Sequence, residues 1–159
     1  MTGTSQPGDI YRSIGVKPVI NASGTTTAYG GTKLRPEARS LPYLFLANID
    51  PQLQTAVLGQ MDGRPRLVVL DTTNFWIDGN RAALAAAVES VDVLFMDEGE
   101  TRSFSGEANL VSAASHILSL GPSTVVVKRG EHGVLVFRSG SIFAAPAFPL
   151  EHVVDPTGA

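Results

Sequence analysis

The sequence of 159 residues contains no cysteine. This absence excludes disulfide bonds, cysteine-ligated zinc or iron–sulfur centres, and a cysteine nucleophile. No apolar run reaches the roughly 20 residues that a transmembrane helix needs, and residues 1–15 lack the apolar core of a signal peptide. The sequence therefore predicts a cytoplasmic protein with no membrane partner.

Positive charge is also scarce, with 12 Lys and Arg against 15 Asp and Glu and a net charge of −3. The chain thus lacks the basic surface that nucleic-acid-binding proteins use, and no nucleic-acid partner is expected. Residues 1–40 carry a net charge of +3 and residues 41–159 a net charge of −6. The Gly-, Thr- and Pro-rich texture of the first segment ends at the same place. We therefore expect a poorly ordered, irregular arm over 1–40 and an α/β domain over 41–159.

Short apolar runs alternate with helical patterns after residue 40. Runs of strand length occur at 41–48, 66–70, 91–96 and 124–128. The spacing of apolar residues predicts helices after Asp50-Pro51, over 80–90, and from Leu110 to Gly121-Pro122. Two further runs, 134–138 and 141–148, predict a hairpin around Ser139-Gly140. This order is typical of an α/β fold with a mainly parallel sheet and helices on both faces.

Ligands of such sheets bind beyond the carboxyl ends of the strands. The segments that follow the predicted strands are therefore the candidates for a functional site. They are Asn48–Asp50, Asp71–Asn74, Asp97–Glu100, Lys128–Gly133 and the terminal Asp155–Ala159.

Three of these segments, in this order and spacing, carry a resemblance to a known family. They are VDVLFMDEGETRSFSGE at 91–107, KRGEHGVLVF at 128–137 and DPTGA at 155–159. With them, residues 41–159 resemble the middle and later part of PfkB/ribokinase-type carbohydrate kinases. The resemblance implies a partial ribokinase-like three-layer domain, ATP and Mg²⁺ as cofactors, and a small sugar as the phosphate acceptor.

The terminal DPTGA resembles the start of the D-T/P-T-G-A-G-D signature of that family. Small residues there leave backbone N–H groups open to phosphate charge, which implies an anion hole that includes Asp155, Thr157, Gly158 and Ala159. The family's catalytic base is the final Asp of the signature, two positions beyond Ala159. No catalytic base is then expected within the chain, and we expect the chain to be inactive by itself. The alternative is that Pro-Thr-Gly forms an ordinary surface turn.

Asp97 and Glu100 stand where the family has an N-x-x-E motif, with Asp in place of Asn. The resemblance implies that they organise Mg²⁺ and phosphates indirectly, through water. Carboxylate oxygen is a ligand type that suits Mg²⁺. The alternative is a solvated helix N-terminus, where acidic side chains suit the helix dipole. Both readings stay open at this point.

The loop after the fourth run resembles the family's strand-loop-strand that borders the nucleotide. The resemblance implies nucleotide binding by Lys128, Arg129, Gly130, Glu131 and Gly133. A basic side chain here can bind phosphate through charge-assisted hydrogen bonds. The alternative is an ordinary hairpin with a solvated basic pair.

The first segment points to a different family. Residues 10–38 resemble the N-terminal arm of fold-type-I pyridoxal-phosphate enzymes of the selenium transferase and ammonia-lyase group. Such an arm carries neither the cofactor lysine nor the phosphate cup. Three functional hypotheses follow: a fragment of an ATP-dependent sugar kinase, a non-catalytic module that binds a nucleotide or phosphate, and a fragment of a pyridoxal-phosphate-dependent enzyme.

Overall fold

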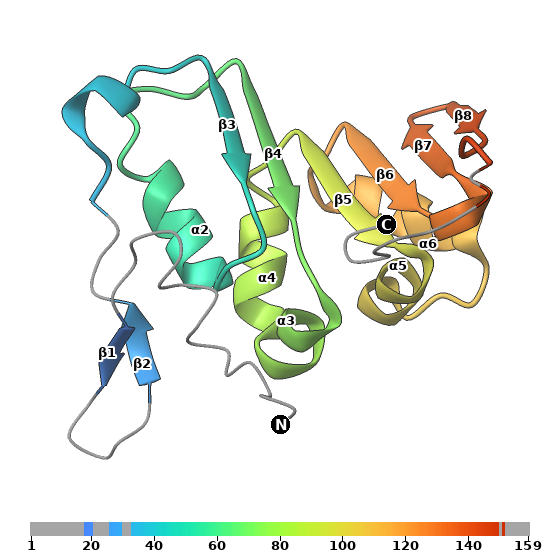
Figure 1. Ribbon diagram of the computed structural model, residues 1–159, viewed down its shortest axis with the longest axis horizontal. Helices are drawn as coiled ribbons and strands as arrows, with labels where there is room; N and C mark the ends of the chain where they lie inside the picture. Colours follow the sequence, from blue (N-terminus) through green and yellow to red (C-terminus); the bar gives the residue numbers. More distant parts are fainter. Residues whose placement is uncertain (1–17, 21–25, 30–32, 150, 152–159) are drawn as a thin grey trace.

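The computed structural model describes residues 18–20, 26–29, 33–149 and 151. Its main element is a six-stranded sheet in the order β3-β4-β5-β6-β7-β8 (Figure 1). Strands β3 to β6 are parallel, and β7 and β8 continue the sheet as an antiparallel hairpin. This confirms the four predicted strands and the predicted hairpin. The strands are Tyr43–Leu46, Leu67–Asp71, Val93–Asp97, Thr124–Lys128, Val134–Arg138 and Ser141–Ala145.

The connections between the parallel strands contain the helices α2 Pro51–Leu58, α3 Asn74–Gly79, α4 Arg81–Val88, α5 Glu98–Ser105 and α6 Leu110–Leu120. Helix α2 begins as predicted, because the Asp50 carboxylate caps it and a proline occupies its first turn. The six-residue helix α3 was not predicted, since it is too short to show an apolar period. Helix α5 was expected only as the helix N-terminus that is the alternative reading of Asp97 and Glu100. Among the described residues, no helix combines the length and the apolar character of a membrane span.

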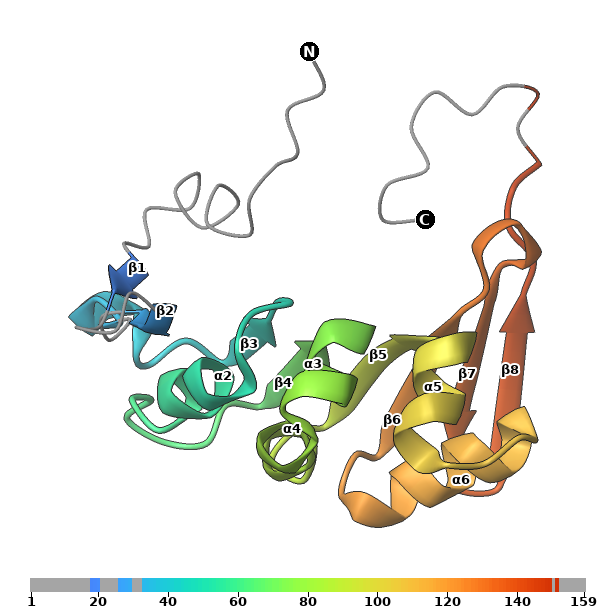
Figure 2. The same ribbon diagram turned by 90° about the horizontal axis from the view of Figure 1, so that it is seen from below.

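In the part of the chain that the structure describes, these helices pack on one face of the sheet (Figure 2). Alternate strand residues point toward them and are almost fully buried, as in β4, β5 and β6. Strands that follow one another in both sequence and space place their right-handed crossovers on the same side. The expectation of helices on both faces is therefore wrong for the described residues.

The segment that was expected to be irregular contains a short antiparallel pair, β1 Pro18–Ile20 and β2 Thr26–Tyr29, and a 3-10 turn, η1 Pro36–Ala38. Leu34 packs against the core, and its N–H donates to Gln60 Oε1 at 2.9 Å. The Asp62 N–H donates to the Arg39 carbonyl at 3.0 Å. Residues 34–39 are thus attached to the segment that follows α2. The domain boundary near residue 40 stays a prediction.

Candidate functional site

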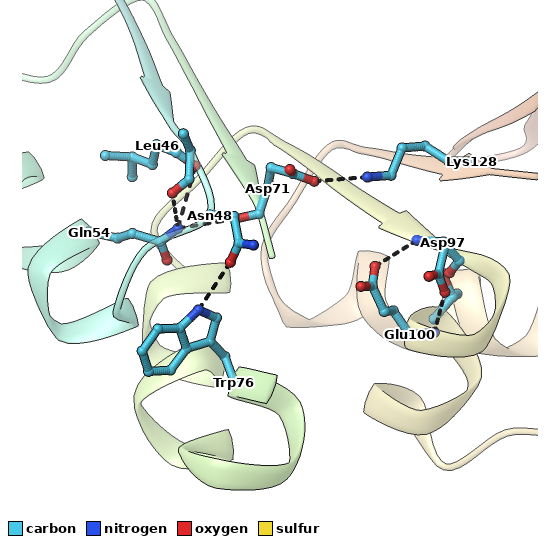
Figure 3. A network of polar contacts seen from close by, with 10 residues as sticks. Leu46, Asn48, Gln54, Asp71, Trp76, Asp97, Glu100 and Lys128 are labelled. Atoms are coloured by element: carbon cyan, nitrogen blue, oxygen red, sulfur yellow. Dashed lines mark hydrogen bonds and ion pairs between the residues drawn. The ribbon is translucent and has the colours of Figure 1, made fainter. Parts of the chain in front are cut away.

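Charged side chains from three neighbouring strands gather at the carboxyl edge of the sheet (Figure 3). Asp71 ends β4, Asp97 ends β5 and Lys128 ends β6. The Lys128 Nζ lies 3.3 Å from the Asp71 Oδ1, so the lysine side chain spans β5 to form this ion pair. Lys128 is a residue that the sequence predicts for the site, whereas Asp71 has no individual role in that prediction. A signal was present, because the apolar runs of β4 and β5 both end in an aspartate.

Asp97 and Glu100 form a capping box at the start of α5. The Glu100 N–H donates to Asp97 Oδ1 at 2.7 Å, and the Asp97 N–H donates to Glu100 Oε2 at 2.8 Å. This arrangement satisfies backbone donors that a helix N-terminus otherwise leaves unpaired. Of the two readings of this motif, the structure shows the helix N-terminus, although Glu100 is buried rather than solvated. The role of Asp97 and Glu100 in organising metal and phosphate stays a prediction.

Burial raises the pKa of the Glu100 carboxyl above its ordinary value of 4.5. The negative charges of Asp97 and Asp71 act in the same direction, while the hydrogen bond from the Asp97 N–H and the charge of Lys128 act against it. Glu100 is therefore electrostatically linked to both members of the ion pair. We call Asp71, Asp97, Glu100 and Lys128 together the charged cluster.

The carboxylates of Asp97 and Glu100 fit a magnesium ion that they bind through its water ligands. Within the described residues, no three His, Cys, Asp or Glu side chains converge as a direct metal cage. Asp97 and Glu100 each use one carboxylate oxygen in the capping box and keep the second for another partner. Mg²⁺ keeps several of its water ligands in proteins. The two carboxylates fit hydrogen bonding to those waters better than a direct coordination cage.

The loop predicted to border a nucleotide sends its two basic side chains to different partners. Lys128 pairs with Asp71, whereas the Arg129 Nε lies 2.5 Å from Glu98 Oε1 on α5. Glu131 is exposed, and its carboxylate lies 3.8 Å from the His132 ring. Gly130 begins the 3-10 turn η2, Gly130–His132, with a φ of +53°.

Gly133 holds this loop against the chain that follows β8. Its φ is +89°, and a Cβ built there would lie 2.0 Å from the Ala145 carbonyl oxygen. The Gly133 carbonyl also accepts from the Arg129 N–H at 2.9 Å, which closes the loop. The need for glycine here thus comes from backbone packing within the protein. No nucleotide is required to explain it.

A buried glutamine joins the ends of β3 and β4 next to the cluster. The Gln54 Nε2 donates to the carbonyls of Ala47 at 2.9 Å and Asp71 at 3.1 Å, and Gln54 is 1% exposed. Nearby, the Trp76 indole donates to Asn48 Oδ1 at 3.0 Å (Figure 3). Gln54 therefore fixes the backbone of the residue whose carboxylate pairs with Lys128. This role of Gln54 could not be predicted from the sequence, because a glutamine within an amphipathic helix gives no such signal.

The remaining predicted site residues, Asp155, Thr157, Gly158 and Ala159, lie outside the described residues. Two surface pockets of about 390 and 320 Å³ lie at the opposite, amino edge of the sheet. Neither is lined by a predicted site residue. The candidate site is therefore the charged cluster at the carboxyl edge.

Residues 63–159 match the model of the pfkB family of carbohydrate kinases. The chain belongs to this family. Its pfkB portion contains β4 to β8 and therefore the whole charged cluster at the carboxyl edge. This membership confirms the kinase resemblance of residues 41–159.

The chain is 29% identical over 153 residues to a cytidine kinase of Thermococcus kodakarensis, a match that spans 94% of this chain and 54% of that protein. Its fold is similar to a PfkB protein from Polaromonas, with a TM-score of 0.64, 21% identity, and coverage of 80% of this chain and 48% of the other. It is also similar to an Escherichia coli putative ribokinase II solved with ATP and Mg²⁺, with a TM-score of 0.60 and 22% identity over 74% of this chain and 41% of the other.

The chain thus spans about half the length of these relatives. The match to the cytidine kinase extends over nearly the whole chain, so it includes most of the arm that resembles pyridoxal-phosphate enzymes. These comparisons support the kinase resemblance and give no support to the pyridoxal-phosphate resemblance of residues 10–38.

Proposed function

We propose that this chain forms the part of a pfkB-type kinase that faces ATP and Mg²⁺, in an enzyme that transfers a phosphoryl group from ATP to a sugar hydroxyl. The observation that carries the proposal is the Lys128–Asp71 ion pair beside the Asp97–Glu100 capping box. These groups lie at the carboxyl edge of a parallel sheet, where ligands of such folds bind. Phosphoryl transfer depends mainly on positioning and on neutralising phosphate charge.

The proposed roles follow from the positions of the side chains. Lys128 donates to phosphate oxygens, and Asp71 holds the lysine over β5 in the direction of the phosphates. The loop that contains Arg129, Gly130, Glu131 and Gly133 borders the nucleotide. Asp97 and Glu100 hold Mg²⁺ through its water ligands, and the ion supplies charge neutralisation at the phosphates. Asp155, Thr157, Gly158 and Ala159 begin the anion hole.

The proposed acceptor is a hydroxyl of a small sugar, and a nucleoside ribose belongs to this class. Similarity to a cytidine kinase supports the nucleoside, and membership of the carbohydrate kinase family supports the free sugar. Both acceptors present the same group, a hydroxyl that loses its proton as the phosphoryl group arrives. We also propose a cytoplasmic location, in keeping with the absence of cysteine.

We further propose that the 159-residue chain binds the nucleotide weakly and does not turn over. The resemblance places the family's catalytic base beyond Ala159, and a general base contributes about 10²- to 10⁴-fold to a rate. With about half the length of its relatives, the chain offers only part of a nucleotide pocket. A dissociation constant of about 1 mM, or roughly 4 kcal/mol, is expected.

The test is a calorimetric titration of the purified chain with ATP and Mg²⁺, followed by turnover assays with cytidine and a panel of free sugars. Weak, magnesium-dependent ATP binding that the Lys128→Met variant loses supports the proposal. ATP binding that is insensitive to this variant would place the nucleotide elsewhere. Clear phosphorylation of any acceptor by the chain would show that a base is already present, and Asp97 and Glu100 would be the first carboxylates to replace.

A further inference from the structure

Strand β8, Ser141–Ala145, lies at one end of the six-stranded sheet (Figure 1). Among the described residues, only β7 pairs with this strand, on its inner side. Natural edge strands are usually protected from pairing with other chains by charged side chains, prolines or bulges. β8 reads SIFAA, and no charged residue occurs over 139–150. Its outer edge is therefore available to a further strand.

The register of the hairpin shows which backbone groups of β8 point outward. The tight turn between β7 and β8 pairs Arg138 with Ser141, and the pair that closes such a turn exchanges both of its N–H···O=C bonds. Hydrogen-bonded and non-hydrogen-bonded pairs then alternate along the antiparallel ladder. Phe143 therefore bonds inward to β7, as Ser141 does. Ile142 and Ala144 direct their N–H and C=O groups away from β7, toward the outer edge.

The outer edge of β8 is short, apolar and symmetric. Ile142 is 53% exposed and Phe143 is 63% exposed, although their side chains lie on opposite faces of the sheet. Pro146 follows the strand and has no N–H to donate. The free edge is thus limited to the outward groups of Ile142 and Ala144. These two residues lie at equal distances along the strand on either side of Phe143.

We propose that β8 pairs antiparallel with β8 of a second copy of this chain, with the two Phe143 residues opposite each other. Two identical strands paired in this way are related by a two-fold axis, so one edge serves both copies. With the axis at Phe143, Ile142 of one copy lies opposite Ala144 of the other, and each outward N–H meets an outward C=O. A shift of the axis toward either end brings Gly140 of the turn or Pro146 opposite the strand, and loses part of this match.

The pairing joins the sheets of the two copies into one continuous sheet. The two Phe143 side chains meet on one face of it, and Ile142 packs against Ala144 of the other copy on the opposite face. Burial of these exposed apolar groups favours association. Because the paired edge is short, the contact belongs to the small, transient class of interfaces, below about 1,200 Å². It uses no residue of the charged cluster, so a failure of the proposed kinase activity would leave it unchanged.

The chain contains no cysteine, so a single introduced cysteine reports contact between two copies. Phe143→Cys should form a disulfide-linked dimer under mild oxidation. The Cα atoms of a directly opposite, non-hydrogen-bonded pair are about 4.5 Å apart, within the range of about 4.4–6.8 Å that a disulfide spans. Ile142→Cys is the matched control on the same strand. The two copies of residue 142 are diagonal neighbours about 7–8 Å apart, so this variant should cross-link much less.

Sedimentation equilibrium of the unmodified chain measures the association without a cross-link. The mass should rise with concentration from that of one chain toward that of two. Ile142→Lys places a charge on the edge and should weaken the dimer at least about tenfold. Val111→Lys should not weaken it, because Val111 is similarly exposed, at 49%, but lies on α6. A single-chain mass up to about 1 mM, equal cross-linking by the two cysteine variants, or equal weakening by the two lysine variants would each overturn the proposal.

Discussion

Lys128 and Asp71 are separated by 57 positions in the sequence, yet their side chains form an ion pair of 3.3 Å at the carboxyl edge of the sheet. They come from β6 and β4, with β5 between them. Backbones two strands apart are separated by about 9.5 Å, a distance that the long lysine side chain can cross. The pair therefore links three strands at the place where the proposed phosphate site begins.

Replacing Lys128 with methionine separates this proposed binding role from any role in stability. Both partners are partly exposed, so loss of the pair should reduce the free energy of unfolding by about 1 kcal/mol or less. Affinity for ATP with Mg²⁺ should fall by about tenfold, because a charge-assisted hydrogen bond is lost. Urea unfolding and calorimetry measure the two effects.

The control for this prediction is Lys33→Met, which removes an exposed lysine from a position before β3. It should change neither quantity. A Lys128→Met variant that binds the nucleotide normally would contradict the proposed role of Lys128.

Glu100 predicts a specific pH dependence of stability. Burial raises its pKa in the folded state above the ordinary value of 4.5. The folded state then holds the proton more tightly than the unfolded state, so the stability linked to protonated Glu100 is complete below pH 4.5 and is lost as pH rises through the raised pKa. Glutamine keeps the shape and the capping acceptor but cannot ionise. Glu100→Gln should therefore gain stability relative to the unmodified chain as pH rises, in urea unfolding from pH 4 to 8.

An exposed carboxylate provides the comparison. Glu107 is exposed and lies after the end of α5, so Glu107→Gln should show no such pH-dependent difference. The difference in the free energy of unfolding between the Glu100→Gln variant and the unmodified chain should change with pH. If this difference is constant from pH 4 to 8, burial does not control the protonation of Glu100.

Gly133, in the loop between β6 and β7, and Gly140, in the turn between β7 and β8, test why glycine is needed at these two positions. Both have a positive φ, of +89° and +72°. A Cβ at Gly133 would lie 2.0 Å from the Ala145 carbonyl oxygen, whereas a Cβ at Gly140 meets nothing within 4 Å. Gly140→Ala should cost about 1 kcal/mol of backbone strain. Gly133→Ala should cost at least about 3 kcal/mol, because the chain after β8 must move as well. Equal losses in thermal unfolding would show that only φ matters.

The buried amide of Gln54 predicts an effect on stability that can be measured without any ligand. Its buried amide donates to carbonyls at the ends of β3 and β4, so Gln54→Leu would leave these carbonyls without a partner. The expected loss is about 1–3 kcal/mol. Gln52 is exposed on the same helix and is the matched control. Gln52→Leu should change the free energy of unfolding by about 0.5 kcal/mol at most. Similar losses for both variants would contradict the bridging role of Gln54.

Much of the fold follows from local patterns. The apolar runs predicted β3 to β6 because each run fits a buried strand, and the capping pair Asp50-Pro51 predicted where α2 begins. Helix α3 was not predicted, because its stability depends on packing and not on a periodic spacing of apolar residues in its own sequence. The sequence also could not predict that the helices cover one side of the sheet, because this depends on the order of the strands in space. Sequential neighbours place their crossovers on one side, and the apolar runs alone do not reveal that order.

The candidate site was predicted only in part, for a similar reason. Asp97, Glu100 and Lys128 were found because they follow strands and match family motifs. The partners that fix them were not found: Asp71 is 57 positions from Lys128, and Gln54 acts on a carbonyl 17 positions away. Glycine is needed at position 133 because the backbone at the end of β8 and just after it passes close to this residue. Such contacts leave no periodic signal, since they join segments that meet only after folding.

The sequence by itself determined the strand and helix types, the hairpin and the family, because these depend on apolar period, capping residues and motif order within short segments. It also determined that both faces of the sheet are apolar, since β4, β5 and β6 lack polar alternation. Only the tertiary structure decided which apolar residues are buried, that Lys128 reaches Asp71 across β5, and that Glu100 is desolvated. Those outcomes depend on which distant segments share a sheet edge, and the energy of a contact is realised only when the fold brings its two partners within a few ångströms of each other.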